Sequence, residues 1–448
     1  MNFRNLAIAL LMGYGGLSVS AQGNNPWTLQ ECLKYALENN IQVQKGLLSQ
    51  EQGEVSLKQQ KAQLMPSMSF STNQSMGYRP FQQSTQIVQN GQVTSTSNKV
   101  TYQGSYNVSA QWTVWNGGIN RMNIEAQELK NEITALSTEQ SELTIQEQIA
   151  NLYVTILYTT EAKKVAEQIA QTVKAQWERG LELQKNGQMA RAEVTQLEAQ
   201  YNSAQYDVVN SETQIANYKR QMKSLLQLDL GTPFDVAGVI PTDEQVMAMI
   251  PAAKDVYELA LANRPEIRSA EKSIEAAALQ ERIAKAGYLP TVSMNASIGD
   301  SHYSASQQGA GEQMKRNLNG NMGVSVSVPI FDQRRNKSAV EQARLQYTTS
   351  QLDLLDRKNN LSSTIEEYWL NANSNQQRYK AAKSTLASQT ESYNLLNEQF
   401  KEGLKNTVDL LQGRDALLNA EQNLLQSKYN TLLYIQLLKF YSGEEIRL

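Results

Sequence analysis

Few residues of this chain could carry out chemistry. His302 is the only histidine and Cys32 the only cysteine among the 448 residues. Nucleophilic catalysis of the Ser-His or Cys-His kind needs an imidazole beside the nucleophile, and most zinc sites use histidine or several cysteines. The chain also lacks a Gly-Lys phosphate-binding loop. We therefore expect no enzyme, no cofactor and no metal site, and the energy for any transport must come from a partner.

The surroundings expected for these two residues fit that exclusion. His302 lies in a polar stretch that is typical of an exposed loop, and a lone Cys32 is most simply a buried apolar residue that cannot form an intramolecular disulfide. The formal net charge is −3, and no basic cluster with interleaved aromatic residues occurs. Nucleic-acid binding therefore has no support.

The start of the chain predicts a secretory signal peptide over residues 1–21. Arg4 precedes an apolar run from Leu6 to Leu17, and Val19-Ser20-Ala21 forms a small-residue cleavage pattern. Gln22 rather than cysteine follows, so no lipid anchor is expected there. No later stretch of eighteen apolar residues predicts a transmembrane helix. We expect such a secreted chain to enter a membrane only as a β-barrel.

The segments that must position any functional site occur twice in the sequence. Similar segments recur at an offset of 224 residues in the first part of each copy and 216 further on, which indicates a duplicated unit. We predict a first repeat at 22–230, a linker at 231–250 and a second repeat at 251–448. The matching segments are Ala36-Leu37-Glu38-Asn39 and Ala260-Leu261-Ala262-Asn263, each expected to open a helix, then Pro66 and Pro290, Val114-Trp115-Asn116 and Ile330-Phe331-Asp332, and Gly187 and Gly403.

Each copy contains two stretches in which apolar and small polar residues alternate strictly. Alternation with period two predicts strands with one apolar and one polar face. We place the strands at about 67–78, 104–115, 290–300 and 320–331, with outer loops at about 79–101 and 301–318. Each strand has about the 9–11 residues that cross a bilayer when tilted, and the polar faces carry no charge. Half-buried strands of a soluble protein remain the alternative for any one of them.

Long polar helices separate the strand pairs. Residues 119–185 and 336–401 contain no proline, and apolar residues recur along them in steps of three, four and seven, which is typical of a coiled coil. At 1.5 Å per residue each helix is about 100 Å long. Shorter helical runs flank them at about 43–64, 191–227, 265–287 and 407–440. Gly187 and Gly403 are expected to end the long helices as left-handed caps.

The number of strands implies an oligomer. One chain supplies four strands, whereas about eight is the practical minimum for a barrel with an interior. Unpaired strand edges in lipid are too costly to leave open, so several chains must share one barrel. A trimer gives twelve strands.

With these features the chain resembles the outer membrane efflux protein family, the TolC-like channels, over essentially its whole mature length. The resemblance implies a mixed α/β membrane protein: a homotrimer whose shared twelve-stranded β-barrel crosses the outer membrane and continues as a helical coiled-coil barrel in the periplasm. It also implies export together with a periplasmic adaptor and an inner-membrane transporter. The segments that carry the resemblance are the Ala-Leu-x-Asn pair, Leu64-Met65-Pro66, Tyr288-Leu289-Pro290, Val328-Pro329-Ile330-Phe331-Asp332, and Phe400 to Leu411.

The resemblance also assigns two groups of site residues. The turns at the repeated glycines match the family's periplasmic tip, where adaptor hairpins dock: Asn186, Gly187, Gln188, Glu402, Gly403 and Leu404. A periplasmic gate follows, in which Asp409 matches the main acidic residue and Glu193 is its counterpart in the first copy. Phe400, Lys405 and Gln412 stand where the family has a hydroxyl-bearing aromatic, an arginine and a second acid, so the gate is expected to be held less tightly.

Three functions stay open at this stage. The preferred one is the outer-membrane exit duct of a tripartite efflux or type I secretion system, in which three copies of Asp409 and Glu193 favour cations at the mouth. In the alternative both carboxylates are merely solvated on helix faces. A secreted coiled-coil scaffold explains the helices but not the strands, and a passive porin explains the strands but not the helices.

Overall fold

The computed structural model describes residues 26–81, 85–89, 92–96, 99–229, 231–304 and 309–447. The predicted signal peptide, residues 1–21, lies outside them. The chain divides into two compact units. The first, here called the helical unit, comprises Met1–Leu47, Leu136–Arg268 and Asp356–Leu448; the second, the strand unit, comprises Leu48–Ala135 and Ser269–Leu355. Among the described residues, no helix is apolar over a stretch long enough to cross a membrane.

The duplication is confirmed element by element. Every main helix of the first copy has a partner in the second, at the offset of 224 or 216 seen in the sequence, and both long helices have 67 residues. The pairs are α1 (Leu29–Asn39) and α6 (Ala253–Asn263), α2 (Ile41–Ala62) and α7 (Pro265–Ala286), α3 (Ile119–Lys185) and α9 (Arg335–Lys401), and α4 (Arg191–Leu226) and α10 (Thr407–Tyr441).

The Ala-Leu-x-Asn segments close helices rather than open them, so that prediction was wrong. The N-cap of helix α1 is Thr28, whose side chain forms a capping box with Glu31, and its C-cap is Asn40, where the backbone turns extended. The buried Asn40 side chain accepts the backbone N–H of Gln42 at 2.8 Å and donates to the carbonyl of Leu225 at 2.9 Å. Contacts with a distant helix therefore place the break, which local sequence could not reveal.

Arg264 takes the same position in the second copy. Its buried guanidinium lies 4.2 Å from the ring centroid of Tyr441, and its Nε donates to Glu266 at 2.8 Å. The Tyr441 hydroxyl in turn donates to Glu147 on α3, which also accepts the hydroxyl of Tyr368 on α9. Burial raises the pKa of both tyrosines, so they stay protonated donors. This cluster fixes the break between α6 and α7 against three other helices.

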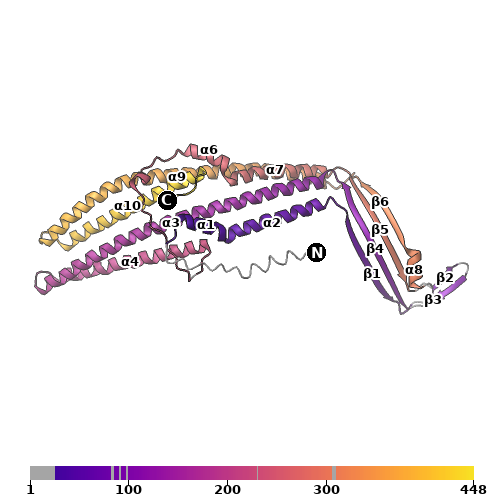
Figure 1. Cartoon of the computed structure of the whole chain (residues 1–448), viewed down its shortest axis with the longest axis horizontal. Coiled ribbons are helices and arrows are strands. Elements are labelled where there is room, and N and C mark those ends of the chain that lie inside the picture. Colours follow the sequence, from indigo (N-terminus) through magenta and orange to yellow (C-terminus); the bar gives the residue numbers. More distant parts are fainter. Residues whose placement is uncertain are drawn as a thin grey trace. The chain divides into compact units, whose positions relative to one another are not determined.

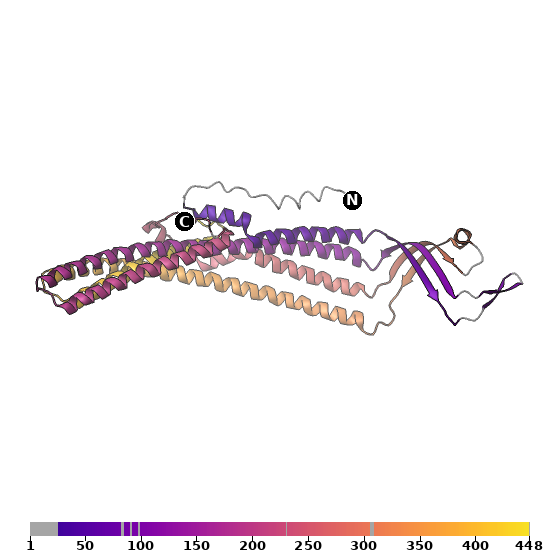
Figure 2. The same ribbon diagram turned by 90° about the horizontal axis from the view of Figure 1, so that it is seen from below.

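Four strands form one antiparallel sheet in the order β1-β4-β5-β6 (Figures 1 and 2). They are β1 (Ser67–Tyr78), β4 (Val100–Trp115), β5 (Thr291–Tyr303) and β6 (Asn319–Ser327). The central pair β4–β5 joins the first copy to the second. All four predicted strands are therefore present, and the two copies share one sheet.

The register aligns the apolar faces of all four strands. Side chains that lie opposite each other across a ladder share a face of the sheet. Large apolar residues on this face are exposed in the single chain, among them Met68 at 74% and Met322 at 72%. The opposite face is lined by serine, asparagine and glutamine. The apolar rows are Phe70–Val108–Ile298, Met68–Ala110–Ala296–Met322 and Trp112–Met294–Val324.

The strand ends depart from the predictions in both directions. β6 was expected to reach residue 331 but stops at Ser327, opposite Thr291, because Pro290 and Pro329 supply no backbone donor beyond that point. β4 begins four residues early, and β5 runs on to Tyr303, so His302 lies on a strand opposite Gly104 and not in a loop. A β-bulge between Thr113 and Trp115 leaves Val114 without a partner.

The predicted outer loops contain secondary structure. The first holds a separate hairpin, β2 (Thr85–Gln89) with β3 (Gln92–Thr96). The second holds helix α8 (Ala310–Asn317), whose buried Gln313 side chain bonds both the N–H and the C=O of Tyr303, at 2.9 and 3.1 Å. Asn317 donates to the carbonyl of Ser301 at 2.6 Å. These side chains take the place of a strand where β5 outruns β6.

A left-handed turn leads from the last strand of each copy into its long helix. Gly117 and Gly118 have φ of +70° and +83° in the first copy. Their counterparts Gln333 and Arg334 have φ of +55° and +68°, a region that costs a residue with a Cβ about 1–2 kcal/mol. The Asp332 carboxylate accepts the Asn336 backbone N–H at 2.8 Å and caps the start of α9 there. The turn geometry is therefore preserved without the glycines.

The linker belongs to the helical unit and makes specific contacts with its other segments. Val236 bridges to Trp27, and the Tyr153 and Tyr429 hydroxyls donate to linker carbonyls. The short helix α5 (Asp243–Val246) carries a half-exposed carboxylate that contacts Lys383 and Tyr379 on α9, each at 2.5 Å, and Lys428 on α10 at 3.7 Å. Hydrogen bonds from Lys383 and Tyr379 lower the pKa of Asp243 to about 2.

Replacing Asp243 with Asn should loosen the linker from α9 and α10. A carboxylate with a depressed pKa stabilises the fold above its ordinary pKa of 3.8 and loses that effect as pH falls toward about 2. The thermal midpoint of the detergent-solubilised variant should therefore lie below that of the unmodified protein at pH 6, and the difference should close between about pH 4 and 2. The neighbouring exposed Glu244→Gln is the control. A pH-independent difference, or none, would contradict this role.

Candidate functional site

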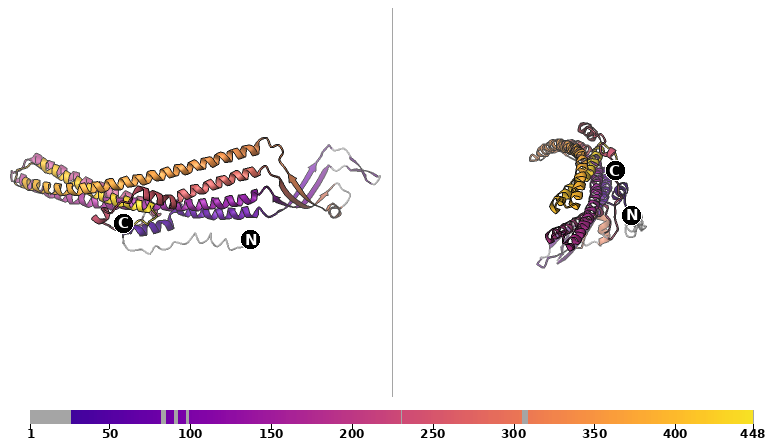
Figure 3. Two further views of the ribbon diagram at one scale, coloured as in Figure 1. Left: turned by 90° about the horizontal axis from the view of Figure 1, so that it is seen from above. Right: turned by 90° about the vertical axis from the view of Figure 1, so that its left-hand side faces the viewer.

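The six residues expected to dock an adaptor lie on two turns of the helical unit. Asn186, Gly187 and Gln188 connect α3 to α4, and Glu402, Gly403 and Leu404 connect α9 to α10. Both turns lie at the same end of their helices, at the left of Figure 1 and of the left-hand view in Figure 3. We call α3 with α4 the first hairpin, and α9 with α10 the second.

Both turns are Schellman motifs of matching geometry. The Gly187 N–H donates to the carbonyl of Gln184 and the Gln188 N–H to that of Leu183, each at 2.9 Å. In the second hairpin, the Gly403 and Leu404 N–H groups donate to Phe400 and Gln399 at 3.1 and 2.9 Å. These bonds satisfy the last helical carbonyls and require a left-handed residue, which the two glycines supply at φ of +71° and +73°.

The turns present an open surface. A Cβ built on either glycine meets nothing within 4 Å, and Leu404 is 75% exposed. Each protomer of an oligomer would present one such exposed leucine, on its second turn. An exposed leucine at a tight turn is the kind of apolar anchor that a partner helix can cover. The geometry fits docking, while the glycines themselves are explained by the turn.

Glu193 and Asp409 occupy equivalent places, as the third residue of α4 and α10. A carboxylate in the first turn is stabilised by the positive end of the helix dipole. The caps differ: the Asn406 side chain accepts the Asp409 backbone N–H at 2.9 Å, whereas Ala190 at the start of α4 offers no side-chain acceptor. The second hairpin therefore holds its acidic residue on a better-defined first turn.

The other predicted gate residues stay within the second hairpin. The Lys405 ammonium lies 3.5 Å from the Asp409 carboxylate, Phe400 is half-buried, and Gln412 is exposed. In the part of the chain that the structure describes, no side-chain hydrogen bond or ion pair joins Glu193, Phe400, Lys405, Asp409 or Gln412 to the opposite hairpin. The structure thus brings Lys405 and Asp409 together and leaves the others apart.

Besides the Glu147 contacts described above, sequence reasoning missed two polar contacts that connect the hairpins near the turns. Arg414 on α10 donates from Nη2 to the Gln200 side chain on α4 at 2.8 Å, and Gln176 on α3 donates to the Tyr393 hydroxyl on α9 at 3.2 Å. Arg414 falls on the buried seam of α10 that also carries Leu410. A charged residue on an apolar seam was the available signal.

The sequence prediction for Cys32 is confirmed: the thiol is fully buried in α1, and burial raises its pKa to about 12. It is therefore neither an accessible nor an ionised nucleophile at neutral pH.

Comparison with known proteins assigns the family. The profile of the outer membrane efflux protein family matches residues 32–226 and again 256–444. The chain belongs to the outer membrane efflux protein family. Members of this family are channels of the outer membrane rather than enzymes, and the outer membrane is where this protein resides.

Individual relatives are more distant. The chain is 26% identical over 271 residues to the alkaline protease secretion protein AprF of Pseudomonas aeruginosa, which covers 60% of this chain and 53% of AprF. It is 30% identical over 160 residues to the outer membrane protein TolC of Escherichia coli, covering 34% and 32% of the two chains. These matches span about half or less of each relative's length.

Two solved structures of membrane proteins share the fold over nearly the whole chain. VceC of Vibrio cholerae aligns with a TM-score of 0.74 at 17% identity, over 94% of this chain and 97% of VceC. CusC aligns with a TM-score of 0.76 at 16% identity, over 95% and 96%. At these identities the likeness concerns the fold, and it confirms the expected fold class.

Proposed function

We propose that this protein is the outer-membrane exit duct of a tripartite efflux or type I secretion system. The observation that carries the proposal is the sheet: four strands of bilayer-spanning length, two from each copy, align one apolar face, and β4 and β6 lead into the long helices α3 and α9. A secreted scaffold would not need that apolar face, and a passive porin would not need helices of 67 residues.

The proposed duct is a homotrimer. β1 and β6 are the outer strands of the sheet, so their free edges need partners if the sheet is to lie in lipid. Three copies give twelve strands, and β6 of one chain can pair with β1 of the next. The polar face then lines the lumen with groups such as Ser69, Ser109 and Ser297, which are joined to neighbours across the ladders and carry no charge.

The proposed partners are an inner-membrane transporter and a periplasmic adaptor. A duct without a nucleotide site depends on an inner-membrane transporter for energy and on a periplasmic adaptor to join the two. The names of its relatives refer to different cargoes: AprF to alkaline protease secretion, and TtgI of Pseudomonas putida to toluene efflux. An uncharged lumen suits both kinds, and we assign the choice of cargo to the pump.

Asn186, Gly187, Gln188, Glu402, Gly403 and Leu404 are the proposed adaptor-docking residues. Glu193 and Asp409, with Phe400, Lys405 and Gln412, are the proposed periplasmic gate. Three copies of two carboxylates around one axis would favour cations at the mouth.

The mass of the detergent-extracted protein and its single-channel conductance in a planar bilayer test the duct. We expect a trimer with a small, cation-favouring conductance. A monomer or dimer that forms no channel would overturn the barrel in favour of a secreted scaffold. A large conductance without ion preference would favour a passive porin.

Replacing Asp409 with Ala should raise that conductance and weaken the preference for cations. The substitution removes three charges from the proposed constriction and also frees Lys405 from its ion pair. The control is Glu391→Ala, an exposed acid on α9 outside the proposed gate. Unchanged conductance in the Asp409 variant would remove the gate assignment.

A photoreactive amino acid in place of Leu404 should cross-link a periplasmic adaptor in intact cells of the native host. Leu404 is the most exposed apolar residue of the two turns, so a docked hairpin must cover it. The same substitution at Met249, which is 91% exposed on the linker, is the control. A channel that conducts normally but shows no adaptor cross-link at Leu404 would place docking elsewhere.

A further inference from the structure

A buried arginine joins the two hairpins just beyond the proposed gate. Arg414 follows Asp409 by five residues, and its side chain is only 10% exposed. Nη2 bonds Gln200 on the first hairpin, and both Nε and Nη2 bond the neighbouring Asp415, at 3.1 and 2.5 Å. Nη1 is buried without a partner. A guanidinium in such a place persists only if the contacts it makes are worth its desolvation.

A second polar contact joins the long helices of the two hairpins at a similar distance from the glycine turns. Gln176 on α3 donates to the hydroxyl of Tyr393 on α9 at 3.2 Å. Counted from the glycine turns, the four residues of the two links lie 10–13 residues along their helices, or about 15–20 Å. Both long and both short helices are therefore tied at one level. We call Arg414–Gln200 and Gln176–Tyr393 the cross-hairpin links.

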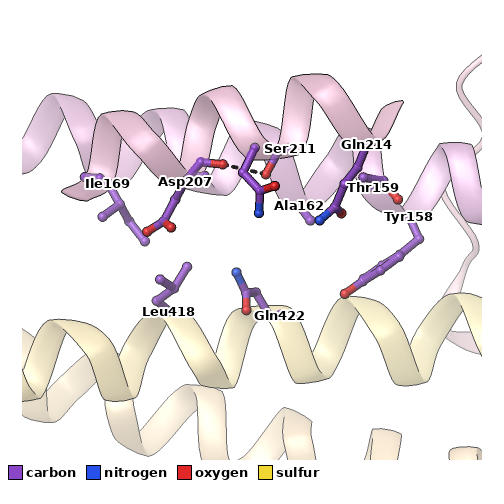
Figure 4. Close-up of a pocket in the computed structure, with 12 residues that line it drawn as sticks. Tyr158, Thr159, Ala162, Ile169, Asp207, Ser211, Gln214, Leu418 and Gln422 are labelled. Atoms are coloured by element: carbon purple, nitrogen blue, oxygen red, sulfur yellow. Dashed lines mark hydrogen bonds between the residues drawn. The ribbon is translucent and has the colours of Figure 1, made fainter. Parts of the chain in front are cut away.

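Helices α4 and α10 are separated by a cavity on the side of Arg414 that faces away from the glycine turns. Leu418 and Gln422, one and two turns further along the same face of α10, line a cavity of about 230 Å³. Figure 4 shows them pointing toward Asp207 and Ser211 of α4. Since α4 and α10 are held apart there, the Arg414–Gln200 bond sets their separation between the cavity and the turns.

The Arg414 link is not repeated by the duplication. At the offset of 216, the counterpart of Arg414 is Glu198, which is exposed, and the counterpart of Gln200 is Ala416, which has no acceptor. The Arg414–Gln200 contact therefore forms in one direction only, from the second hairpin to the first within a chain. The residues that the family resemblance assigns to the gate make no such contact in the described structure, because Phe400 lacks a hydroxyl and Lys405 pairs on its own hairpin.

We propose that Arg414 and Gln200, supported by Gln176 and Tyr393, are positioning residues that hold the closed state of the periplasmic end by tying the two hairpins of each chain together. This inference rests on the proposed duct function. Opening then requires the second hairpin to move away from the first, which breaks the Arg414–Gln200 bond. Arg414 keeps Asp415 on its own helix as a partner throughout, so its charge is never left alone and the link is reversible.

Conductance of the purified channel tests the link. Arg414→Met and Gln200→Met keep side-chain length and remove the bond, and each should raise the mean conductance about three- to ten-fold, the range expected for one lost hydrogen bond. The double variant should do no more than the stronger single one, because both remove the same contact. Glu198→Gln, at the counterpart of Arg414, should leave conductance unchanged. Gln200→Glu replaces the bond with an ion pair and should lower it.

A reversible cross-link separates gating from misfolding. Cysteines replacing both Gln200 and Arg414 are bridged with a reducible bifunctional thiol reagent, while the buried Cys32 stays unreacted. The bridged channel should pass less current than the same channel after reduction. Equal current in both states, or unmodified conductance in the two methionine variants, would overturn the link. If the unmodified protein forms no channel, the duct proposal itself fails.

Discussion

The pairing of β4 with β5 is the constraint on which the rest of this structure depends. It joins the first copy to the second in one register, from Gln103 opposite Tyr303 to Thr113 opposite Ser293. Because side chains alternate, a slip of one residue would turn an apolar row toward the polar face. With this pair in the centre, β1 and β6 become the outer strands, and each copy sends its long helix out of the sheet through an equivalent left-handed turn.

Most of the fold could be predicted because its signals are local. The ends of α3 and α9 follow from the caps expected at Gly187 and Gly403, and the strands follow from alternation. The errors fall where distant contacts decide. Asn40 and Arg264 break helices because Leu225 and Tyr441 hold them, and no neighbouring residue announces that. His302 joins a strand because β4 extends beside it.

In the candidate site, too, the features set by local sequence could be predicted, and the contacts set by packing between distant segments could not. The turn geometry follows from the two glycines, since it depends on φ alone, and the equivalence of Glu193 and Asp409 follows from the duplication. What the five gate residues touch could not be read from their positions, because it depends on how one hairpin packs against the other. The contacts that join the hairpins near the turns, made by Arg414 and Gln176, could be anticipated only from the charge of Arg414 on an apolar seam.

The differences between the copies are as informative as their likeness. The two hairpins share their fold but differ at the residues that contact each other. The contact from Arg414 to Gln200 runs one way, because the counterparts Glu198 and Ala416 cannot form it in reverse. The caps differ in the same sense, with Asn406 on the second hairpin and Ala190 on the first. Helix length and turn geometry are thus what the duplication preserves, while the divergent residues give each hairpin its own place: the second carries the buried charge, and the first supplies the neutral acceptor from which that charge can separate.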